Sequence, residues 1–268
     1  MTIYSYIQGG LGNQMFQYAS LKGIAKNIGA DFCIPNHTQA VDDGIGNKLR
    51  TELFDSFDLN VNVGLLNNGH APVVNERFFH FDEELFKLCP DHVSLHGYFQ
   101  TEKYFKHIES EIRGDFTFKD EILKPCKEMI SSVENPIALH VRRTDYVTNS
   151  DNHPPCSLEY YQKALEYFDS GRNIIVFSDE PEWCKEQKLF SDDRFLISEN
   201  DDNRVDLCLM TLCDDFIIAN SSFSWWGAWL SQNKEKKVIA PVQWFGTGYT
   251  KDHDTKDLIP NGWTRITA

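Results

Sequence analysis

Short apolar runs alternate with amphipathic stretches along most of the chain. β-Prone residues open it, a glycine-rich turn follows at residues 9–12, and apolar residues then recur at helical spacing from Met15 to Ile28. In the N-terminal half the pattern predicts strands at 3–7, 31–34 and 93–98 and helices at 15–28, 101–112 and 119–135. Residues 36–75 are polar with weak periodicity, and the pattern assigns no element to them.

The alternation of strand and helix becomes more regular after residue 135. It predicts strands at 136–141, 174–177, 195–197, 216–219 and 238–240 and helices at 157–169, 181–188, 203–213 and 222–232. Strands that alternate with helices form parallel sheets joined by right-handed crossovers. We therefore expect an α/β protein with two Rossmann-like domains facing a cleft, one at residues 1–132 and one at 133–268.

The charge balance limits the classes of ligand. The chain has 268 residues, with 26 Lys and Arg against 40 Asp and Glu, and its formal net charge is −14. Such a chain disfavours nucleic acid as a partner, because nucleic-acid binding draws on clustered positive charge. An anionic ligand must therefore be held by a local cluster of cations.

The seven cysteines include no C-x-x-C pair, and their odd number forbids complete internal pairing. The first residues lack the basic and apolar regions of a signal peptide, and no apolar run reaches the length of a membrane helix. The histidines show no spacing typical of a metal site. We expect a reduced, cytoplasmic protein that requires no metal.

The candidate cation cluster follows the predicted strand at 136–141. His140, Arg142, Arg143 and Asp145 lie at or just beyond the carboxyl end of this strand, where open α/β sheets bind ligands. Arginine suits phosphate because its guanidinium presents a fork of donors. The pattern favours a phosphorylated small molecule as ligand. The alternative is structural, with the arginines paired to Asp145 and other acids across a domain boundary.

Two further polar segments follow predicted strands. Asp179 comes directly after the strand at 174–177, where its carboxylate would accept hydrogen bonds from guanine or ribose, or would instead cap the next helix. Ser221, Ser222 and the backbone N–H of Phe223 open the helix at 222–232. Hydroxyl groups and free N–H groups at a helix start make a good phosphate cradle.

The glycine-rich turn at 9–12 matches the dinucleotide-binding pattern G-x-G-x-x-G poorly, since Met15 stands at the third glycine position. One interpretation is that the glycines only allow a tight turn from strand to helix. The other is that the turn places Asn13 and Gln14 as hydrogen-bonding groups in the cleft.

Four stretches together resemble the motifs of the bacterial α-1,2-fucosyltransferases, glycosyltransferase family 11. They are Gly9–Ala19, His140–Tyr146, Phe177–Glu180 and Ala219–Leu230, and they occur in family order. Gly97–Phe105 also resembles a segment that recurs in the family. Thr144 replaces the usual glycine of H-x-R-R-G-D-Y, as in the related α-1,6-fucosyltransferases.

The resemblance implies a GT-B-like fold and an inverting, metal-independent transfer of L-fucose from GDP-β-L-fucose to the 2-hydroxyl of a terminal galactoside. Arg142 would neutralise the β-phosphate as its bond to fucose breaks, a charge that grows in the transition state. The donor-binding residues would be His140, Arg142, Arg143, Asp179, Ser221, Ser222 and Phe223. Asn13 and Gln14 would face the acceptor.

Two groups compete for the role of general base. Asp145 lies near Arg142 in the sequence, but neighbouring cations lower the pKa of a carboxyl and make it a poor base. The alternative is a departing phosphate oxygen, with Asn13 positioning the sugars. We favour the phosphate oxygen.

The expected partners are GDP-fucose and a galactose-containing glycan, such as an oligosaccharide or a bacterial O-antigen or capsule precursor. A lipid-linked acceptor would bring the enzyme into peripheral contact with the inner face of the cytoplasmic membrane. Acceptor choice is expected to depend on residues 36–80 and 148–156. The alternatives are a transferase for a different nucleotide sugar and a non-catalytic nucleotide- or sugar-binding protein.

Overall fold

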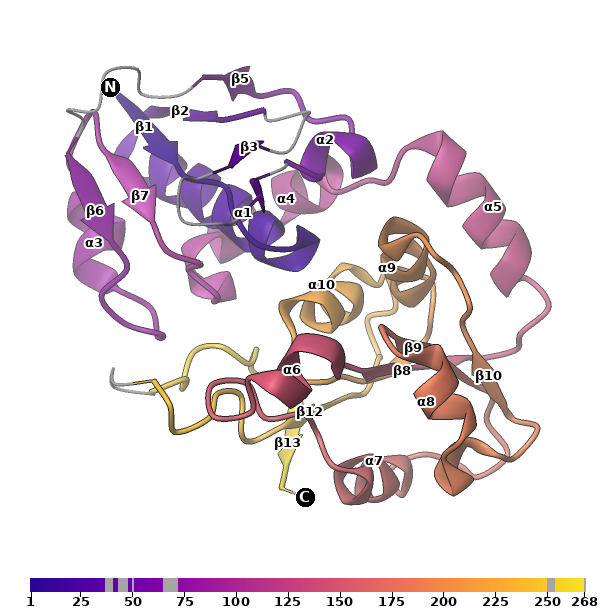
Figure 1. Ribbon diagram of the computed structural model, residues 1–268. Helices are drawn as coiled ribbons and strands as arrows, with labels where there is room; N and C mark the ends of the chain where they lie inside the picture. The colour runs from indigo at the N-terminus through magenta and orange to yellow at the C-terminus, as the bar shows by residue number, and fades with distance from the viewer. Residues whose placement is uncertain (37–40, 43–47, 50, 65–71, 250–253, 268) are drawn as a thin grey trace. The chain divides into compact units, whose positions relative to one another are not determined.

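The chain forms two compact units in the computed structural model, which describes residues 1–36, 41–42, 48–49, 51–64, 72–249 and 254–267 (Figure 1). Unit 1 comprises residues 1–119 and 252–260, and unit 2 comprises residues 120–251 and 261–268. The predicted boundary after residue 132 lies too late, because helix α5 (Asp120–Ile130) packs on helix α9 (Asn203–Thr211) within unit 2. A returning segment also joins unit 1, where Thr101 Oγ1 donates to the carbonyl of Asp257 at 2.6 Å.

Unit 1 contains a five-stranded parallel sheet in the order β5-β2-β1-β7-β6. Its strands are β1 (Thr2–Ser5), β2 (Asp31–Ile34), β5 (Asn62–Val63), β6 (Val73–Asn75) and β7 (Ser94–His96). A separate antiparallel pair consists of β3 (Val41–Asp42) and β4 (Lys48–Leu49). The helices are α1 (Leu11–Ile28), α2 (Leu53–Ser56), α3 (Glu83–Leu88) and α4 (Glu109–Asp115), with the 3₁₀ turns η1 (Glu102–Tyr104) and η2 (Lys106–Ile108).

Helix α1 is the centre of unit 1, in contact with β1, β2, α2 and α3. It begins after Gly10 and ends at Gly29, whose left-handed conformation (φ 69°) is one that glycine adopts without steric penalty. Within the helix, Gly23 lies against the backbone of η1, since a Cβ at this position would be 2.0 Å from the carbonyl oxygen of Tyr104. The glycine therefore sets how closely the helix and this turn approach.

The predicted helix at 101–112 is wrong in its first two turns, which form η1 and η2 before α4 begins at Glu109. Phe105 interrupts the helix because its backbone (φ −128°, ψ 4°) is not helical. Its side chain is fully buried and packs on Phe16 of α1, with ring centroids 6.3 Å apart. Burial of this ring therefore outweighs local helix propensity.

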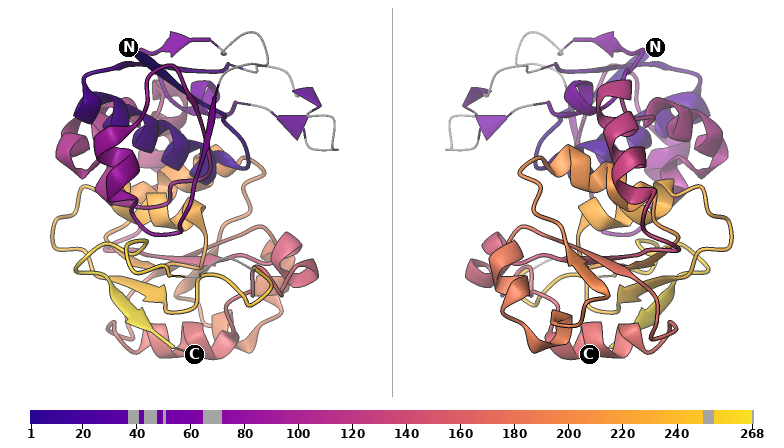
Figure 2. Two further views of the ribbon diagram at one scale, coloured as in Figure 1. Left: turned by 90° about the vertical axis from the view of Figure 1, so that its left-hand side faces the viewer. Right: turned by 90° about the vertical axis from the view of Figure 1, so that its right-hand side faces the viewer.

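Unit 2 contains a six-stranded parallel sheet in the order β10-β9-β8-β11-β12-β13. The strands are β8 (Ile137–Val141), β9 (Ile174–Ser178), β10 (Phe195–Ile197), β11 (Asp215–Ile217), β12 (Val238–Pro241) and β13 (Thr264–Ile266). Besides α5 and α9, its helices are α6 (Thr144–Thr148), α7 (Leu158–Leu165), α8 (Pro181–Lys185) and α10 (Ser222–Leu230), with the turn η3 (Lys188–Phe190). Helices α9 and α10 cover one face of the sheet and α7 the other (Figures 1 and 2).

The strands of unit 2 are apolar because both faces of the sheet are covered. All five residues of β8 are buried, and Tyr160 and Tyr161 of α7 pack beneath them in the core. Strand β8 lies between β9 and β11, so the loops after these three strands meet at one edge. This edge carries the polar segments that the sequence singled out.

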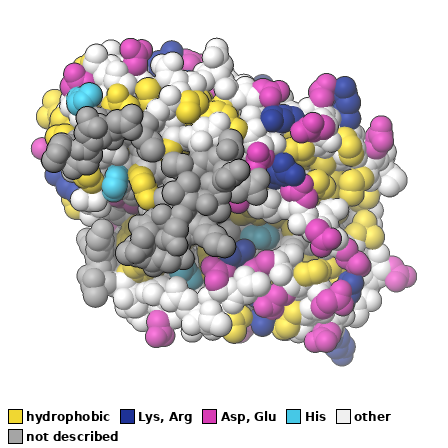
Figure 3. Space-filling model, turned by 45° about the horizontal axis from the view of Figure 1, so that its top comes forward, with side chains coloured by type: hydrophobic (Ala, Val, Ile, Leu, Met, Phe, Trp, Pro, Cys, Tyr) yellow, Lys and Arg dark blue, Asp and Glu magenta, His cyan; other side chains and the backbone are white. Residues whose placement is uncertain are grey.

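The surface is acidic without being uniform. On the face shown in Figure 3, Asp and Glu side chains are interspersed with Lys and Arg. In the part of the chain that the structure describes, no helix is long and apolar enough to cross a lipid bilayer. Parts of the 36–80 segment, expected to influence acceptor choice, lie outside the described residues, at 37–40, 43–47, 50 and 65–71.

Candidate active site at the carboxyl edge of the unit 2 sheet

Three segments that are distant in sequence come together after strands β8, β9 and β11. Strand β8 leads into Arg142, β9 into Asp179 and β11 into Ser221, and β8 pairs with both other strands. Each segment follows a strand as predicted, and parallel pairing brings the ends of these three strands to one edge of the sheet. The structure also shows which of their side chains face one another.

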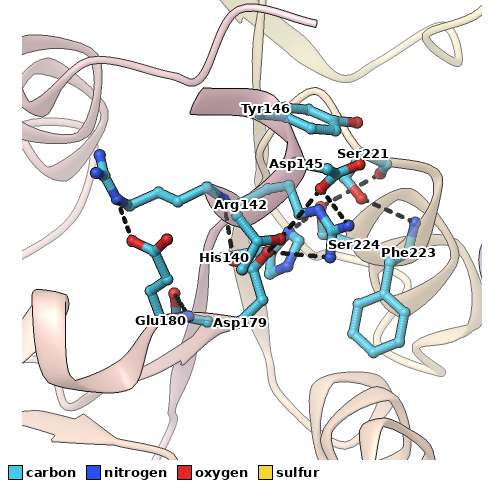
Figure 4. A network of polar contacts seen from close by, with 12 residues as sticks. His140, Arg142, Asp145, Tyr146, Asp179, Glu180, Ser221, Phe223 and Ser224 are labelled. Carbon is cyan, nitrogen blue, oxygen red and sulfur yellow. Dashed lines mark hydrogen bonds and ion pairs between the residues drawn. The ribbon is translucent and has the colours of Figure 1, made fainter. Parts of the chain in front are cut away.

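Arg142 lies between two carboxylates (Figure 4). One terminal nitrogen is 2.5 Å from Asp145 Oδ1, and the other is 3.1 Å from Asp179 Oδ2. Arg142 is partly exposed and Asp145 is 60% exposed, whereas Asp179 is only 17% exposed. Asp145 is therefore the partner that an incoming anion can displace most easily.

Asp179 organises the turn that follows β8. Its Oδ1 accepts the backbone N–H of Arg143 at 2.9 Å, and its Oδ2 accepts a hydrogen bond from the Thr144 hydroxyl. With the ion pair to Arg142, these contacts give the carboxylate a bracing role between β9 and β8. Its predicted role at guanosine or ribose is not visible in this arrangement, because all the contacts described are to the β8 turn.

Arg143 contacts Glu180 and Trp183 at the start of α8. Its Nε donates to Glu180 Oε2 at 2.7 Å, and its guanidinium carbon lies 3.8 Å from the ring centroid of Trp183. The ion pair and the cation–π contact together hold the guanidinium against the start of α8. In this structure Arg143 fastens the β8 turn to α8, and its role in binding the donor stays a prediction.

His140 is 5% exposed and connects β8 to α10. Its Nδ1 lies 2.9 Å from Ser224 Oγ, which in turn donates to the carbonyl of Ser221. The pKa of His140 is lowered to about 3, chiefly by burial; the charge of Asp179 opposes this shift and the charge of Arg142 adds to it. The side chain is therefore a neutral hydrogen-bonding group and carries no positive charge for a phosphate.

The start of α10, predicted to bind phosphate, is capped by the side chain of Ser221. Ser221 Oγ accepts the N–H of Phe223 at 3.3 Å, so the two groups expected to bind phosphate separately are bonded to each other. Ser222 is the first residue of the helix. A phosphate at this position would replace a long hydrogen bond and would meet the positive end of the helix dipole.

Asn220, which the sequence did not single out, fixes the loops around this helix start. Its Nδ2 donates to the carbonyls of Pro154 and Trp244, both at 2.9 Å, and its own carbonyl accepts from Tyr146 Oη at 3.0 Å. Tyr146 in turn stacks on His153, with ring centroids 5.0 Å apart. One buried amide thus ties the 149–156 and 242–249 loops to the site.

Unit 1 contains the other two predicted residues. Gln14 is 1% exposed, and its amide is used within unit 1: Nε2 donates to the carbonyl of Gly9 at 2.8 Å, and Oε1 accepts the N–H of Glu52 at 2.8 Å. The expectation that Gln14 faces a ligand is therefore corrected to a structural role. Asn13 is less buried, and its Oδ1 accepts from Gln100 Nε2 at 2.9 Å.

Within the residues that the structure describes, no group of three or more His, Cys, Asp and Glu side chains is placed to hold a metal ion. The charged groups at the unit 2 edge are Arg142 and Arg143 against Asp145, Asp179 and Glu180. The site is therefore slightly acidic, and both terminal nitrogens of Arg142 lie beside carboxylates.

Several known proteins resemble the chain over most of its length. An α-1,2-colitosyltransferase of Escherichia coli is 31% identical, over 98% of this chain and 98% of the relative. The O-antigen biosynthesis glycosyltransferase WbnK of Escherichia coli is 28% identical, over 95% and 98%. A bovine galactoside α-(1,2)-fucosyltransferase 2 is 26% identical, over 83% and 67%.

Solved structures share the fold at lower identity. POFUT1 in complex with GDP superposes with a TM-score of 0.57 at 14% identity, covering 89% of this chain and 97% of that one. The α-1,6-fucosyltransferase NodZ soaked with GDP-fucose gives a TM-score of 0.54 at 13% identity, covering 85% and 92%. The fold is accordingly α/β and GT-B-like. Glycosyl transferase family 11 matches residues 2–267, and the chain belongs to that family.

Proposed function

We propose that the protein transfers L-fucose from GDP-β-L-fucose to the 2-hydroxyl of a terminal galactoside, with inversion at the anomeric carbon. The observation that carries this proposal is Arg142 at the carboxyl end of β8, partly exposed and beside the start of α10. Support for the donor and acceptor comes from the relatives, which include a galactoside α-(1,2)-fucosyltransferase and a fucosyltransferase soaked with GDP-fucose.

The donor's diphosphate takes the place of Asp145 on Arg142. Asp145 lies on the short helix α6 and is mostly exposed, so its movement breaks one exposed ion pair, which costs about 0.2–1 kcal/mol. Asp179 keeps Arg142 in position through its second nitrogen. The guanidinium fork then faces the β-phosphate, whose negative charge grows as the bond to fucose breaks.

The reaction proceeds without a metal ion in this proposal. Arg142 and the first turn of α10 supply the positive potential that stabilises the leaving GDP. Ser221 contributes its hydroxyl once its hydrogen bond to the N–H of Phe223 is exchanged for bonds to phosphate.

Release of Asp145 from Arg142 also bears on the general base. In the ligand-free protein the Asp145 carboxylate is paired with Arg142, and its Oδ1 lies 2.5 Å from a guanidinium nitrogen. Displacement by the diphosphate separates Asp145 from its cation, but the phosphate oxygen that replaces it is itself a proton acceptor next to the reacting carbon. We retain the phosphate oxygen as the base, with Asp145 as the alternative that Asp145→Asn tests.

The acceptor is a galactose-containing glycan of a bacterial surface polysaccharide precursor or a related oligosaccharide. The similarity to an O-antigen biosynthesis glycosyltransferase supports this setting. We further propose that the enzyme acts in the cytoplasm, where a lipid-linked acceptor would bring it to the inner face of the membrane.

GDP-colitose is a second candidate donor to compare with GDP-fucose, because one relative is an α-1,2-colitosyltransferase. Colitose is fucose that lacks the 3-hydroxyl. A donor site that hydrogen-bonds this hydroxyl therefore discriminates strongly against colitose. The test is to incubate the protein with GDP-fucose or GDP-colitose and either lactose or N-acetyllactosamine, and to determine the product linkage by NMR. An α-1,2-fucosylated product is expected; transfer of colitose alone, or no transfer, contradicts the proposed donor.

A further inference from the structure

Three polar side chains on one face of α1 hold the loops at the carboxyl ends of β1 and β7. Gln14 bonds the carbonyl of Gly9, Gln17 Nε2 donates to the carbonyl of Gly97 at 3.0 Å, and Ser20 Oγ donates to the carbonyl of Phe99 at 3.0 Å. All three side chains are buried. Because β1 and β7 are adjacent parallel strands, this row of hydrogen bonds fixes two neighbouring loops at a ligand-binding edge.

The loop after β7 is held in an unusual conformation. Gly97 (φ 155°) and Phe99 (φ 51°) both have positive φ, which is uncommon for a residue such as phenylalanine. The Glu76 carboxylate accepts the N–H groups of Tyr98 and Phe99, at 3.0 and 2.7 Å. Strained backbone that the surrounding structure maintains in this way is concentrated at functional sites.

This loop brings Tyr98 and Gln100 beside Asn13. Gln100 Nε2 donates to Asn13 Oδ1 at 2.9 Å. A Cβ built on Gly9 would lie 3.0 Å from Asn13 Nδ2 and 3.5 Å from Tyr98 Cε1, so glycine leaves the corner open between them. The Tyr98 residue is 37% exposed. Burial and the Glu76 charge raise the pKa of its hydroxyl, which therefore stays neutral.

One atom in this corner is unpaired. Gln100 Oε1 is buried and accepts no hydrogen bond from any residue that the structure describes. If the oxygen and nitrogen positions of the Gln100 and Asn13 amides were both exchanged, the hydrogen bond between the two side chains would remain. A buried N–H group of Gln100 would then lack a partner instead of its oxygen. An unpaired buried polar atom is unfavourable by about 1–3 kcal/mol, and native proteins retain few of them. A hydroxyl group from a ligand would remove this penalty.

We propose that Tyr98, Gln100 and Asn13 form a subsite for a sugar ring of the acceptor, with Tyr98 stacking on its apolar face and Gln100 accepting a hydrogen bond from one of its hydroxyls. An exposed aromatic ring beside amide groups suits saccharides, which combine an apolar face with hydroxyls at the rim. Gln100 also orients the Asn13 amide through their hydrogen bond. The subsite deepens the proposed function and rests on it.

The test is steady-state transfer from GDP-fucose to lactose by Gln100→Leu, Gln100→Glu and Tyr98→Leu, with GDP binding measured by titration. Gln100→Leu is expected to raise the KM for lactose about tenfold, because a bonded sugar hydroxyl loses its partner, while the KM for GDP-fucose and the Kd for GDP stay unchanged. Gln100→Glu keeps an acceptor oxygen for the sugar hydroxyl, and its second oxygen can accept from Asn13 if that amide turns over, so this variant should recover most of the loss. Lys103→Met, an exposed change in the same segment, is the control.

Two results overturn the inference while leaving the proposed function intact. One is an unchanged lactose KM in both Gln100→Leu and Tyr98→Leu, with or without a change in melting temperature, which would assign the unpaired atom to an internal water. The other is a rise in the KM for GDP-fucose instead. Failure of the wild-type protein to bind GDP or to fucosylate a galactoside overturns the proposed function itself, and this subsite with it.

Discussion

Arg142 and Arg143 are neighbours in the chain but have different surroundings. Arg142 meets two carboxylates at the sheet edge, whereas Arg143 is held between Glu180 and Trp183. Successive residues along a strand point in opposite directions, and the two guanidinium groups just past the end of β8 likewise reach different partners.

Arg142→Ala should therefore lower kcat by about 10²- to 10³-fold, the effect of removing a donor that stabilises transition-state charge. Arg143→Ala should leave kcat within a few-fold of wild type but lower the free energy of unfolding by about 1 kcal/mol. Fucose transfer and urea unfolding of both variants measure this contrast. Equal losses of kcat in the two would mean that Arg143 also contacts the donor.

In the proposed mechanism Asp145, which is paired with Arg142, competes with the diphosphate of the donor for this arginine. Asp145→Asn removes the competing charge, so GDP should bind about two- to fivefold more tightly, the free energy of one exposed ion pair. Titration with GDP measures the change, and Glu182→Gln, which removes a carboxylate paired with Lys185, is the matched control. Weaker GDP binding by Asp145→Asn would contradict the displacement. Near-wild-type kcat in the same variant would exclude Asp145 as the general base.

Close backbone packing, at the scale of elements, decides the position of α1. Replacing a helical glycine with alanine normally stabilises a helix by about 0.5–1 kcal/mol. At Gly23 the sign should reverse, because the new Cβ would be 2.0 Å from the carbonyl oxygen of Tyr104. Gly23→Ala should thus destabilise unit 1 by about 1–3 kcal/mol, seen as a lower urea midpoint.

Gly114→Ala is the matched control for this helix contact. Gly114 lies in α4, and a Cβ there would meet nothing within 4 Å. The urea midpoint of Gly114→Ala should stay the same or rise. If the urea midpoint of Gly23→Ala also stays the same or rises, the close approach of α1 to η1 does not require a glycine at this position.

The periodic elements were the part of the fold that the sequence predicted well. Strands β8, β9 and β12 are continuous apolar runs because helices cover both faces of their sheet, and such runs are recognisable. Edge strands β5 and β6 have two and three residues, too few to show alternation, and both fall in the segment left unassigned. Helix α6 follows a strand directly and has no buried residue, so no apolar period marks it.

The candidate site was predictable in its location and less so in its contacts. Parallel strands bring their carboxyl ends together, which places the segments at 140–145, 179 and 220–223 at one edge whatever their side chains do. Tertiary contacts decide which side chains remain available. The Gln14 side chain is hydrogen-bonded to Gly9 and Glu52, and the Asn220 side chain is hydrogen-bonded to two loops. Neither set of partners can be predicted from the local sequence.

The stability of the whole molecule should change with pH partly through one buried histidine. His140 has a pKa of about 3 in the folded protein, against about 6.5 in an unfolded chain. Between these values the unfolded state binds more protons, and stability falls as the pH is lowered through this window. The loss approaches about 1.4 kcal/mol per pH unit for this one group.

His140→Asn keeps a hydrogen-bond donor for Ser224 but cannot titrate. The free energy of unfolding of the wild type should drop more steeply than that of His140→Asn between pH 6.5 and pH 4.5, as measured by urea unfolding at several pH values. Parallel curves for the two proteins would show that His140 is not held neutral by the fold.

In the proposed mechanism unit 2 binds the GDP portion of a sugar donor through Arg142 without a metal ion. Isothermal titration of the purified protein with GDP, UDP and GDP-fucose in the presence of EDTA tests it most directly. We expect GDP and GDP-fucose to bind with micromolar dissociation constants and UDP to show no binding. A folded protein that fails to bind GDP under these conditions, or binds UDP equally well, would rule out the proposed GDP site.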